Sequence, residues 1–103
     1  MESLKRIFGL GPSVDYSKLV KEGAMIIDVR SKGEYAGGHI NGSMNIPVDQ
    51  LEKNLGRLPD KDEPIITVCA SGMRSSTAKK ILQSKGYTSV YNGGSWMSLS
   101  DKL

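Results

Sequence analysis

Two continuous apolar segments of strand length constrain the fold of this chain more than any other feature. "AMIIDV" spans residues 24–29 and "PIITV" spans residues 64–68, and both are rich in β-branched residues. Unbroken apolar runs of this length are typical of strands that are buried on both faces. Two shorter segments, "MNI" at 44–46 and "TSVYN" at 88–92, predict further strands. The sequence therefore predicts a central sheet that needs cover on both of its faces.

Segments with helical spacing alternate with these strands. The predicted helices cover residues 15–23, 48–58 and 75–86, with one helical turn around Glu34 and Tyr35 and a turn followed by a helix over 93–103. Asp15 suits the N-cap of the first helix, and Gly23 suits its C-terminal stop. Alternation of strands with helices of this length predicts an α/β fold: a small, mostly parallel sheet flanked by helices on both faces.

The chain length allows one domain with one hydrophobic core. A chain of 103 residues is enough for a single hydrophobic core and too short for two domains. The breaker-rich joint "FGLGP" at residues 8–12 separates the beginning of the chain from its body. We expect residues 1–12 to form an N-terminal extension and residues 13–103 to form the domain.

Composition excludes several classes of function. The net charge of +3 is mild and the lysines are scattered, so no nucleic-acid partner is expected. No segment approaches the roughly 20 apolar residues of a membrane span, and no secretory signal is present, so we expect no membrane partner and a cytoplasmic location. A single cysteine excludes an internal disulfide and a zinc site built from thiolates, and no metal is expected.

Two polar clusters follow the two strong strands. "DVR" begins at Asp28, and "CASGMRS" begins at Cys69, the only cysteine of the chain. Open α/β sheets bind their ligands beyond the carboxyl ends of the strands, and neighbouring parallel strands end at the same edge. The sequence therefore predicts a functional site at this edge, with Cys69 in it.

The loop after Cys69 has the chemistry of an activated thiol. Gly72 allows backbone conformations that a side chain would forbid, so the strand–loop–helix turn can aim several N–H groups inward. These donors and the positive end of the following helix lower the pKa of a thiol and favour the thiolate. Arg74, five residues after Cys69, can fold over the same pocket or bind an anionic substrate. The alternative is a small buried cysteine with no reactivity, which the glycine turn, the helix and the arginine disfavour.

Three ordered segments between Asp15 and Leu99 resemble one protein family. They are "IIDVRSKGEYAGGHINGSMNIP" (26–47), "VCASGMRSSTAKKIL" (68–82) and "VYNGGSWMSL" (90–99). The chain is similar to the single-domain rhodaneses, a family of sulfurtransferases. The resemblance implies the rhodanese-like fold for residues 13–103 and a sulfurtransferase activity that uses no cofactor.

The resemblance also implies a mechanism. The Cys69 thiolate would take the sulfane sulfur of a small anionic donor such as thiosulfate and become a persulfide. An acceptor, either cyanide or a thiol that can belong to a protein, would then take that sulfur. The substrate-binding positions implied by the loop are Ala70, Ser71, Gly72, Met73, Arg74 and Ser75. Ala70 stands where the family often has a charged residue, which removes one contact to an anion.

Three residues outside the loop are expected to support the site. Asp28 and Arg30 are expected to brace it as an ion pair or through hydrogen bonds to neighbouring loops, and the alternative is direct contact with the substrate. His39, the only histidine, is expected to fix its loop by hydrogen bonding, with Asp28 as its partner, rather than to act as a base.

Two other functions are alternatives to sulfur transfer. Ala70 and the few charges in the loop are compatible with a non-enzymatic module that carries sulfur or binds a regulatory partner. A phosphatase or an arsenate reductase of the same fold is disfavoured. Those enzymes have five residues between cysteine and arginine, whereas this chain has the four residues Ala70 to Met73.

Overall fold

Four strands form the central sheet of the computed structural model, which describes residues 13–103. They are β1 (Met25–Asp28), β2 (Met44–Asn45), β3 (Ile65–Cys69) and β4 (Val90–Ser95). Their order in the sheet is β2-β1-β3-β4, and every pair is parallel. The predicted α/β architecture is thereby confirmed. The expected N-terminal extension, residues 1–12, lies outside the described residues.

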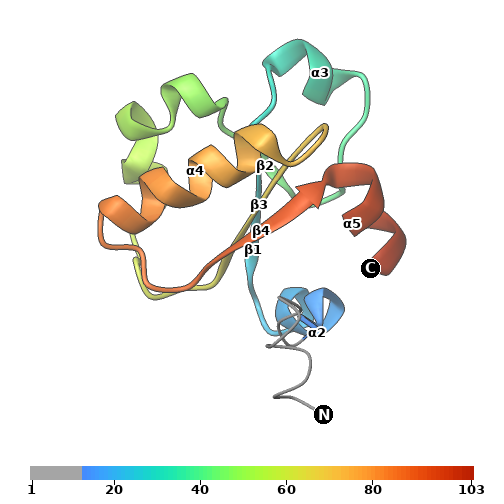
Figure 1. Ribbon diagram of the computed structural model, residues 1–103, viewed down its shortest axis with the longest axis horizontal. Coiled ribbons are helices and arrows are strands. Elements are labelled where there is room, and N and C mark those ends of the chain that lie inside the picture. Colours follow the sequence, from blue (N-terminus) through green and yellow to red (C-terminus); the bar gives the residue numbers. More distant parts are fainter. Residues whose placement is uncertain (1–12) are drawn as a thin grey trace, which may run out of the picture.

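Helices cover both faces of the sheet. The helices are α2 (Tyr16–Lys21), α3 (Lys32–Ala36), α4 (Met73–Ser84) and α5 (Trp96–Lys102), with 3₁₀ turns η1 (Val48–Gln50) and η2 (Glu52–Arg57). Figure 1 shows α4 on one side of the sheet and α5 on the other, with α3 above the ends of the strands. Among the helices of residues 13–103, none combines the length and the apolar character that crossing a membrane requires.

The alternation of side chains along β3 divides the core into two clusters. Ile65 and Cys69 lie in the cluster under α4, η1 and η2, whereas Ile66 and Val68 lie in the cluster under α2 and α5. Successive residues of a strand point to opposite faces of the sheet, which explains this division. Cys69 therefore ends its strand on the α4 side, at the carboxyl edge of the sheet.

The helix predicted over residues 48–58 is wrong in type. The segment forms the two 3₁₀ turns η1 and η2, and Asn54 interrupts the second with φ −120° and ψ 20°. Leu51 and Leu58 are nevertheless fully buried, so the apolar spacing identified the correct inward positions. Short 3₁₀ turns can bury the same leucines without the regular bonds of an α-helix.

The last strand is longer than predicted. Residues 93–95, which were expected to form a turn, continue β4 up to α5. A β-bulge makes this possible: Thr67 pairs with Asn92 and Val68 pairs with Gly94, so Gly93 is the extra residue. A Cβ atom at Gly93 would lie 2.8 Å from Cγ2 of Ile66, so the approach of β4 to β3 requires glycine here.

Candidate active site

The Cys69 sulfur takes the place of a cap at the beginning of α4. Gly72 is the N-cap residue, with a left-handed φ of +104°, and it provides no side-chain cap. Instead, the N–H of Gly72 donates to Sγ of Cys69 at 2.9 Å, and the N–H of Ser75 donates to it at 3.4 Å. Because N–H groups at a helix N-terminus have no partner within the helix, they favour an acceptor that carries negative charge.

Opposing effects act on the pKa of the Cys69 thiol. Burial raises this pKa, since the side chain is fully enclosed. The side-chain hydrogen bond between Cys69 and Ser75, together with hydrogen bonds from the N–H groups of Ser75, Gly72 and Ser71, lowers it. The hydrogen bonds prevail, so the pKa lies below the usual value of a thiol. This is the direction that a nucleophilic cysteine requires.

The hydroxyl of Ser75 connects the sulfur to β4. Its Oγ lies 3.5 Å from Sγ of Cys69 and donates to Oδ1 of Asn92 at 2.6 Å. Oδ1 also accepts from the N–H of Gly94 at 2.9 Å. Asn92 lies at the bulge, one residue before Gly93, and the bulge brings its side chain to the loop. Asn92 was not predicted from the sequence as a site residue.

Arg74 forms an ion pair with a carboxylate on another element, and its charge also interacts with Cys69. Its Nη1 and Nη2 atoms donate to Oε1 and Oε2 of Glu34 at 2.6 Å and 3.0 Å. The bond from Arg74 is the largest of the effects that lower the pKa of Glu34 to about 2, and the same bond raises the pKa of Arg74. Glu34 also caps α3 through the N–H of Ser31, so its carboxylate is held in place.

Asp28 and Arg30 form a buried ion pair on the face opposite α4. Nη2 of Arg30 lies 2.7 Å from Oδ2 of Asp28 and also donates to the carbonyl oxygen of Gly38 at 2.7 Å. The guanidinium stacks on the Trp96 ring at 4.6 Å. The pair therefore joins the end of β1 to the loop after α3 and to the beginning of α5. The carboxylate of Asp28 is paired with Arg30 and is not available to His39.

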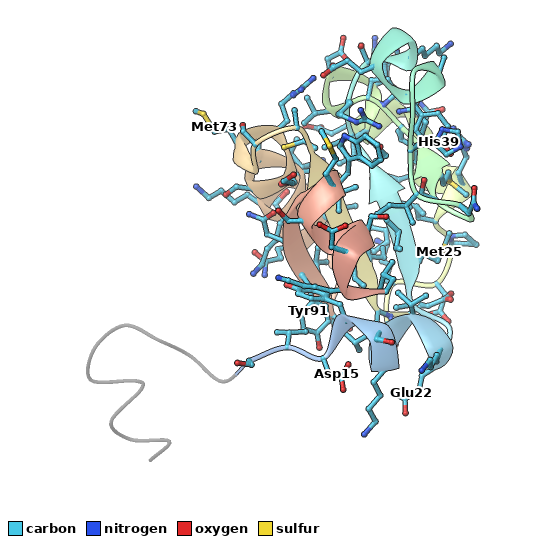
Figure 2. All side chains as sticks on the ribbon, turned by 90° about the vertical axis from the view of Figure 1, so that its right-hand side faces the viewer. Asp15, Glu22, Met25, His39, Met73 and Tyr91 are labelled. Atoms are coloured by element: carbon cyan, nitrogen blue, oxygen red, sulfur yellow. The ribbon has the colours of Figure 1, made fainter. Side chains whose placement is uncertain are left out.

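His39 lies away from the cysteine loop, and its expected partner is wrong. Its Nδ1 is 2.8 Å from the carbonyl oxygen of Tyr35, and its ring stacks on the Tyr35 ring at 3.8 Å. A carbonyl oxygen only accepts, so Nδ1 carries a hydrogen. Figure 2 shows His39 and the exposed Met73 on opposite sides of the upper end of the molecule.

A hollow lies on the surface beside Arg74. It has a volume of about 280 Å³ and is lined in part by Lys32, Asp49 and Arg74, whereas Cys69 does not line it. Ala70 and Ser71 are exposed in the loop itself. Among the described residues, no cluster of three metal-ligating side chains is present.

Glu34 and Asn92 belong to the site but were not predicted from the sequence, although each has a local sequence signal. Glu34 has a local signal, since Ser31 and Glu34 have the spacing of a capping box, but its bond to Arg74 spans forty positions. Asn92 precedes two glycines at the end of a strand, which is a signal for a bulge.

Residues 14–98 match the sequence pattern of the rhodanese-like domain. The chain belongs to this family. It is 38% identical over 69 residues to the thiosulfate sulfurtransferase PspE of Escherichia coli (strain K12), which covers 66% of this chain and 66% of PspE. It is 33% identical over 92 residues to the thiosulfate sulfurtransferase GlpE of Pseudomonas fluorescens (strain SBW25), which covers 89% of this chain and 80% of GlpE.

A solved structure supports the same assignment for this rhodanese-like domain. The human single-domain sulfurtransferase TSTD1 superposes with a TM-score of 0.77 at 31% identity, covering 90% of this chain and 98% of TSTD1. The chain spans 54% to 66% of the length of three of the curated relatives that it matches. The predicted family is thereby confirmed.

Proposed function

We propose that this rhodanese-like domain is a sulfurtransferase that carries sulfur as a persulfide on Cys69. In the first step the thiolate attacks the sulfane sulfur of a donor such as thiosulfate. A new S–S bond forms, the S–S bond of thiosulfate breaks, and sulfite leaves with the electron pair. In the second step cyanide or a thiolate attacks the outer sulfur, and the Cys69 thiolate is restored.

The observation that carries this proposal is the position of the sulfur at the beginning of α4. Sγ of Cys69 accepts from the N–H groups of Gly72 and Ser75, which favours the thiolate without a general base. Two of the relatives described above are named as thiosulfate sulfurtransferases. The four-residue loop between Cys69 and Arg74 also suits a sulfur atom better than a tetrahedral oxyanion.

We assign roles to the other predicted residues on the same basis. The N–H groups of the loop from Ala70 to Ser75 would hold the negative outer sulfur of the persulfide. Arg74 would attract the donor, and it must then exchange its bond to Glu34 for a bond to the donor. Asp28, Arg30 and His39 would act at a distance by bracing loops.

Access to the sulfur requires local movement. Cys69 has an exposed fraction of 0%, so a donor reaches Sγ only after the loop or the side chains that cover the sulfur move. The loop residues Ala70 and Ser71 are exposed and lie directly beside the sulfur in the chain. A lone thiol that must stay reduced between turnovers is also consistent with the cytoplasm.

An intact-mass measurement tests the proposal. The wild type and Cys69→Ser are incubated separately with thiosulfate, glutathione persulfide and polysulfide, and then with cyanide. We expect the wild type to gain the mass of one sulfur atom with at least one donor and to lose it with cyanide. If no donor loads the wild type above the level of Cys69→Ser, the proposal is wrong.

A second candidate is a sulfur-carrying or regulatory module that works only through a partner protein. Two observations favour it: Ala70 brings no charge to the loop, and the guanidinium of Arg74 already binds Glu34. Loading at Cys69 with negligible turnover on small acceptors, and rapid turnover on a protein thiol, would support this candidate. Fast multiple turnover with cyanide would contradict it. Cys69-dependent hydrolysis of an aryl phosphate would instead support the disfavoured phosphatase.

A further inference from the structure

The Ser75 hydroxyl has one hydrogen and three acceptors within reach. Its Oγ lies 2.6 Å from Oδ1 of Asn92, 3.0 Å from the carbonyl oxygen of Gly72 and 3.5 Å from Sγ of Cys69. A hydroxyl donates only one hydrogen at a time. The three acceptors therefore compete, and the shortest contact is the one to Asn92.

The orientation of the Asn92 amide is fixed by the backbone. The N–H of Gly94 can only donate, and it lies 2.9 Å from the amide oxygen of Asn92. Oδ1 must therefore face Gly94, and it can only accept from Ser75. The Nδ2 group points to the carbonyl oxygen of Gly72, at 3.5 Å. Asn92 thus offers Ser75 an acceptor and no donor.

With its hydrogen on Asn92, Ser75 presents a lone pair to Cys69. In that arrangement the Cys69 thiol donates its S–H to Oγ of Ser75, which suits the neutral thiol. A thiolate has no hydrogen to donate and needs one instead. To stabilise the thiolate, the hydroxyl must rotate away from Oδ1 and donate to Sγ.

We propose that Asn92 is a positioning residue whose amide oxygen holds the Ser75 hydrogen while Cys69 is neutral and gives it up when Sγ becomes negative. The rotation itself changes no covalent bond. The S–H bond of Cys69 breaks when its proton leaves to solvent, and the electron pair stays on Sγ. In the catalytic cycle, the hydrogen would return to Asn92 when the charge moves to the outer sulfur of the persulfide. This last role rests on the proposed sulfurtransferase function, whereas the effect on the thiol does not.

Other charged groups near Cys69 also influence the thiol, and they are the same in all the variants of the test below. On α4, the positive charge of Arg74 interacts with Cys69. On α3, Glu34 neutralises that cation, and on β1, Asp28 is paired with Arg30. On β4 the titratable side chain is that of Tyr91, which packs in the core cluster on the opposite face.

A double-mutant cycle on the thiolate titration tests this proposal. The thiolate is followed by its ultraviolet absorbance against pH, with Cys69→Ser as the blank, in the wild type, Asn92→Ala, Ser75→Ala and the double variant. Without the Asn92 acceptor, only the carbonyl oxygen of Gly72 competes with the sulfur for the Ser75 hydrogen, so Ser75 donates more readily to a negatively charged Sγ. We expect the ratio of thiolate to thiol at a fixed pH to rise roughly three- to tenfold in Asn92→Ala, the scale of one hydrogen bond.

The other variants should lower the ratio of thiolate to thiol or leave it unchanged. Ser75→Ala should lower the ratio, because the sulfur loses a donor. Adding Asn92→Ala to Ser75→Ala should then change nothing, because Asn92 acts only through Ser75. Asn92→Asp keeps the acceptor and adds a negative charge, so it should lower the ratio. If circular dichroism shows that Asn92→Ala does not fold, Asn92→Asp replaces it in the cycle. The drop in the ratio of thiolate to thiol that Asn92→Asp causes should then be smaller in the Ser75→Ala background than in the wild type.

Two results would overturn the inference. One is an equal effect of the Asn92 substitution with and without Ser75, which indicates a purely structural role. The other is a lower thiolate ratio in Asn92→Ala than in the wild type. Failure of the proposed function would appear separately, as a wild type that titrates as expected but accepts no sulfur from any donor.

Discussion

Replacing Gly93 by alanine should destabilise the domain by crowding the two neighbouring strands. The added Cβ would lie 2.8 Å from Cγ2 of Ile66, and 3.0 Å from both the carbonyl oxygen of Thr67 and Cγ1 of Val68. All three neighbours are buried in β3, an inner strand of the sheet. They cannot retreat without disturbing the strand pairing, so β4 itself must move outward.

The expected cost follows from these contacts. Overpacking a buried site typically costs about 1–3 kcal/mol, and the backbone oxygen of Thr67 cannot rotate out of the way, which favours the upper half of that range. The lower entropy of the unfolded alanine chain offsets about 0.4–1 kcal/mol. The net loss in the free energy of unfolding should therefore be about 2 kcal/mol for Gly93→Ala.

Urea unfolding followed by circular dichroism measures this loss. Gly33→Ala is the matched control, because no atom lies within 4 Å of its added Cβ and the residue is inside α3. We expect the control to be neutral or stabilising by up to ~1 kcal/mol, because alanine favours a helix more than glycine does. A Gly93→Ala variant as stable as this control would refute the account of the bulge.

Three further predictions concern the ion pairs and the thiol. Glu34→Gln frees the guanidinium of Arg74, so the Michaelis constant for thiosulfate should fall roughly two- to fivefold, and high salt should remove the difference; an unchanged constant at low salt would contradict this. Asp28→Ala leaves Arg30 as a buried charge without its carboxylate, so urea denaturation should show a loss of about 3–5 kcal/mol; a loss below ~1 kcal/mol would show that the pair is not needed. Because the pKa of Cys69 is lowered in the fold, its thiolate should persist to lower pH in the folded chain than in the urea-unfolded chain, as followed by ultraviolet absorbance. Coincident titrations would show that the hydrogen bonds to Sγ do not stabilise the thiolate.

Local patterns in the sequence predicted the architecture well, because the strong strands are buried on both faces. The apolar runs ending near Asp28 and Cys69 become β1 and β3, paired in parallel at the centre of the sheet. Their carboxyl ends carry the polar clusters, so the edge that holds the cysteine loop could also be predicted. Leucine spacing over 48–58 identified buried positions but not the 3₁₀ geometry, since both kinds of turn can bury the same side chains.

The partners within the site could not be predicted, because they depend on how distant elements pack. The bond between Arg74 and Glu34 depends on the position of α3, which the sequence did not predict. Asn92 reaches the loop only because Gly93 makes a bulge against β3, and that fit depends on side chains more than twenty positions away. The catalytic and supporting roles assigned to the site residues stay predictions until the variants are measured.

Transfer of an isotope-labelled sulfur atom from thiosulfate tests whether Cys69 carries a persulfide. Thiosulfate is labelled either at its outer, sulfane sulfur or at its inner, sulfonate sulfur, and the protein is separated from small molecules before counting. We expect one label per Cys69 from the outer position alone, released as thiocyanate by cyanide and missing in Cys69→Ser. Label from the inner sulfur, or equal labelling of the wild type and Cys69→Ser, would contradict a persulfide on Cys69.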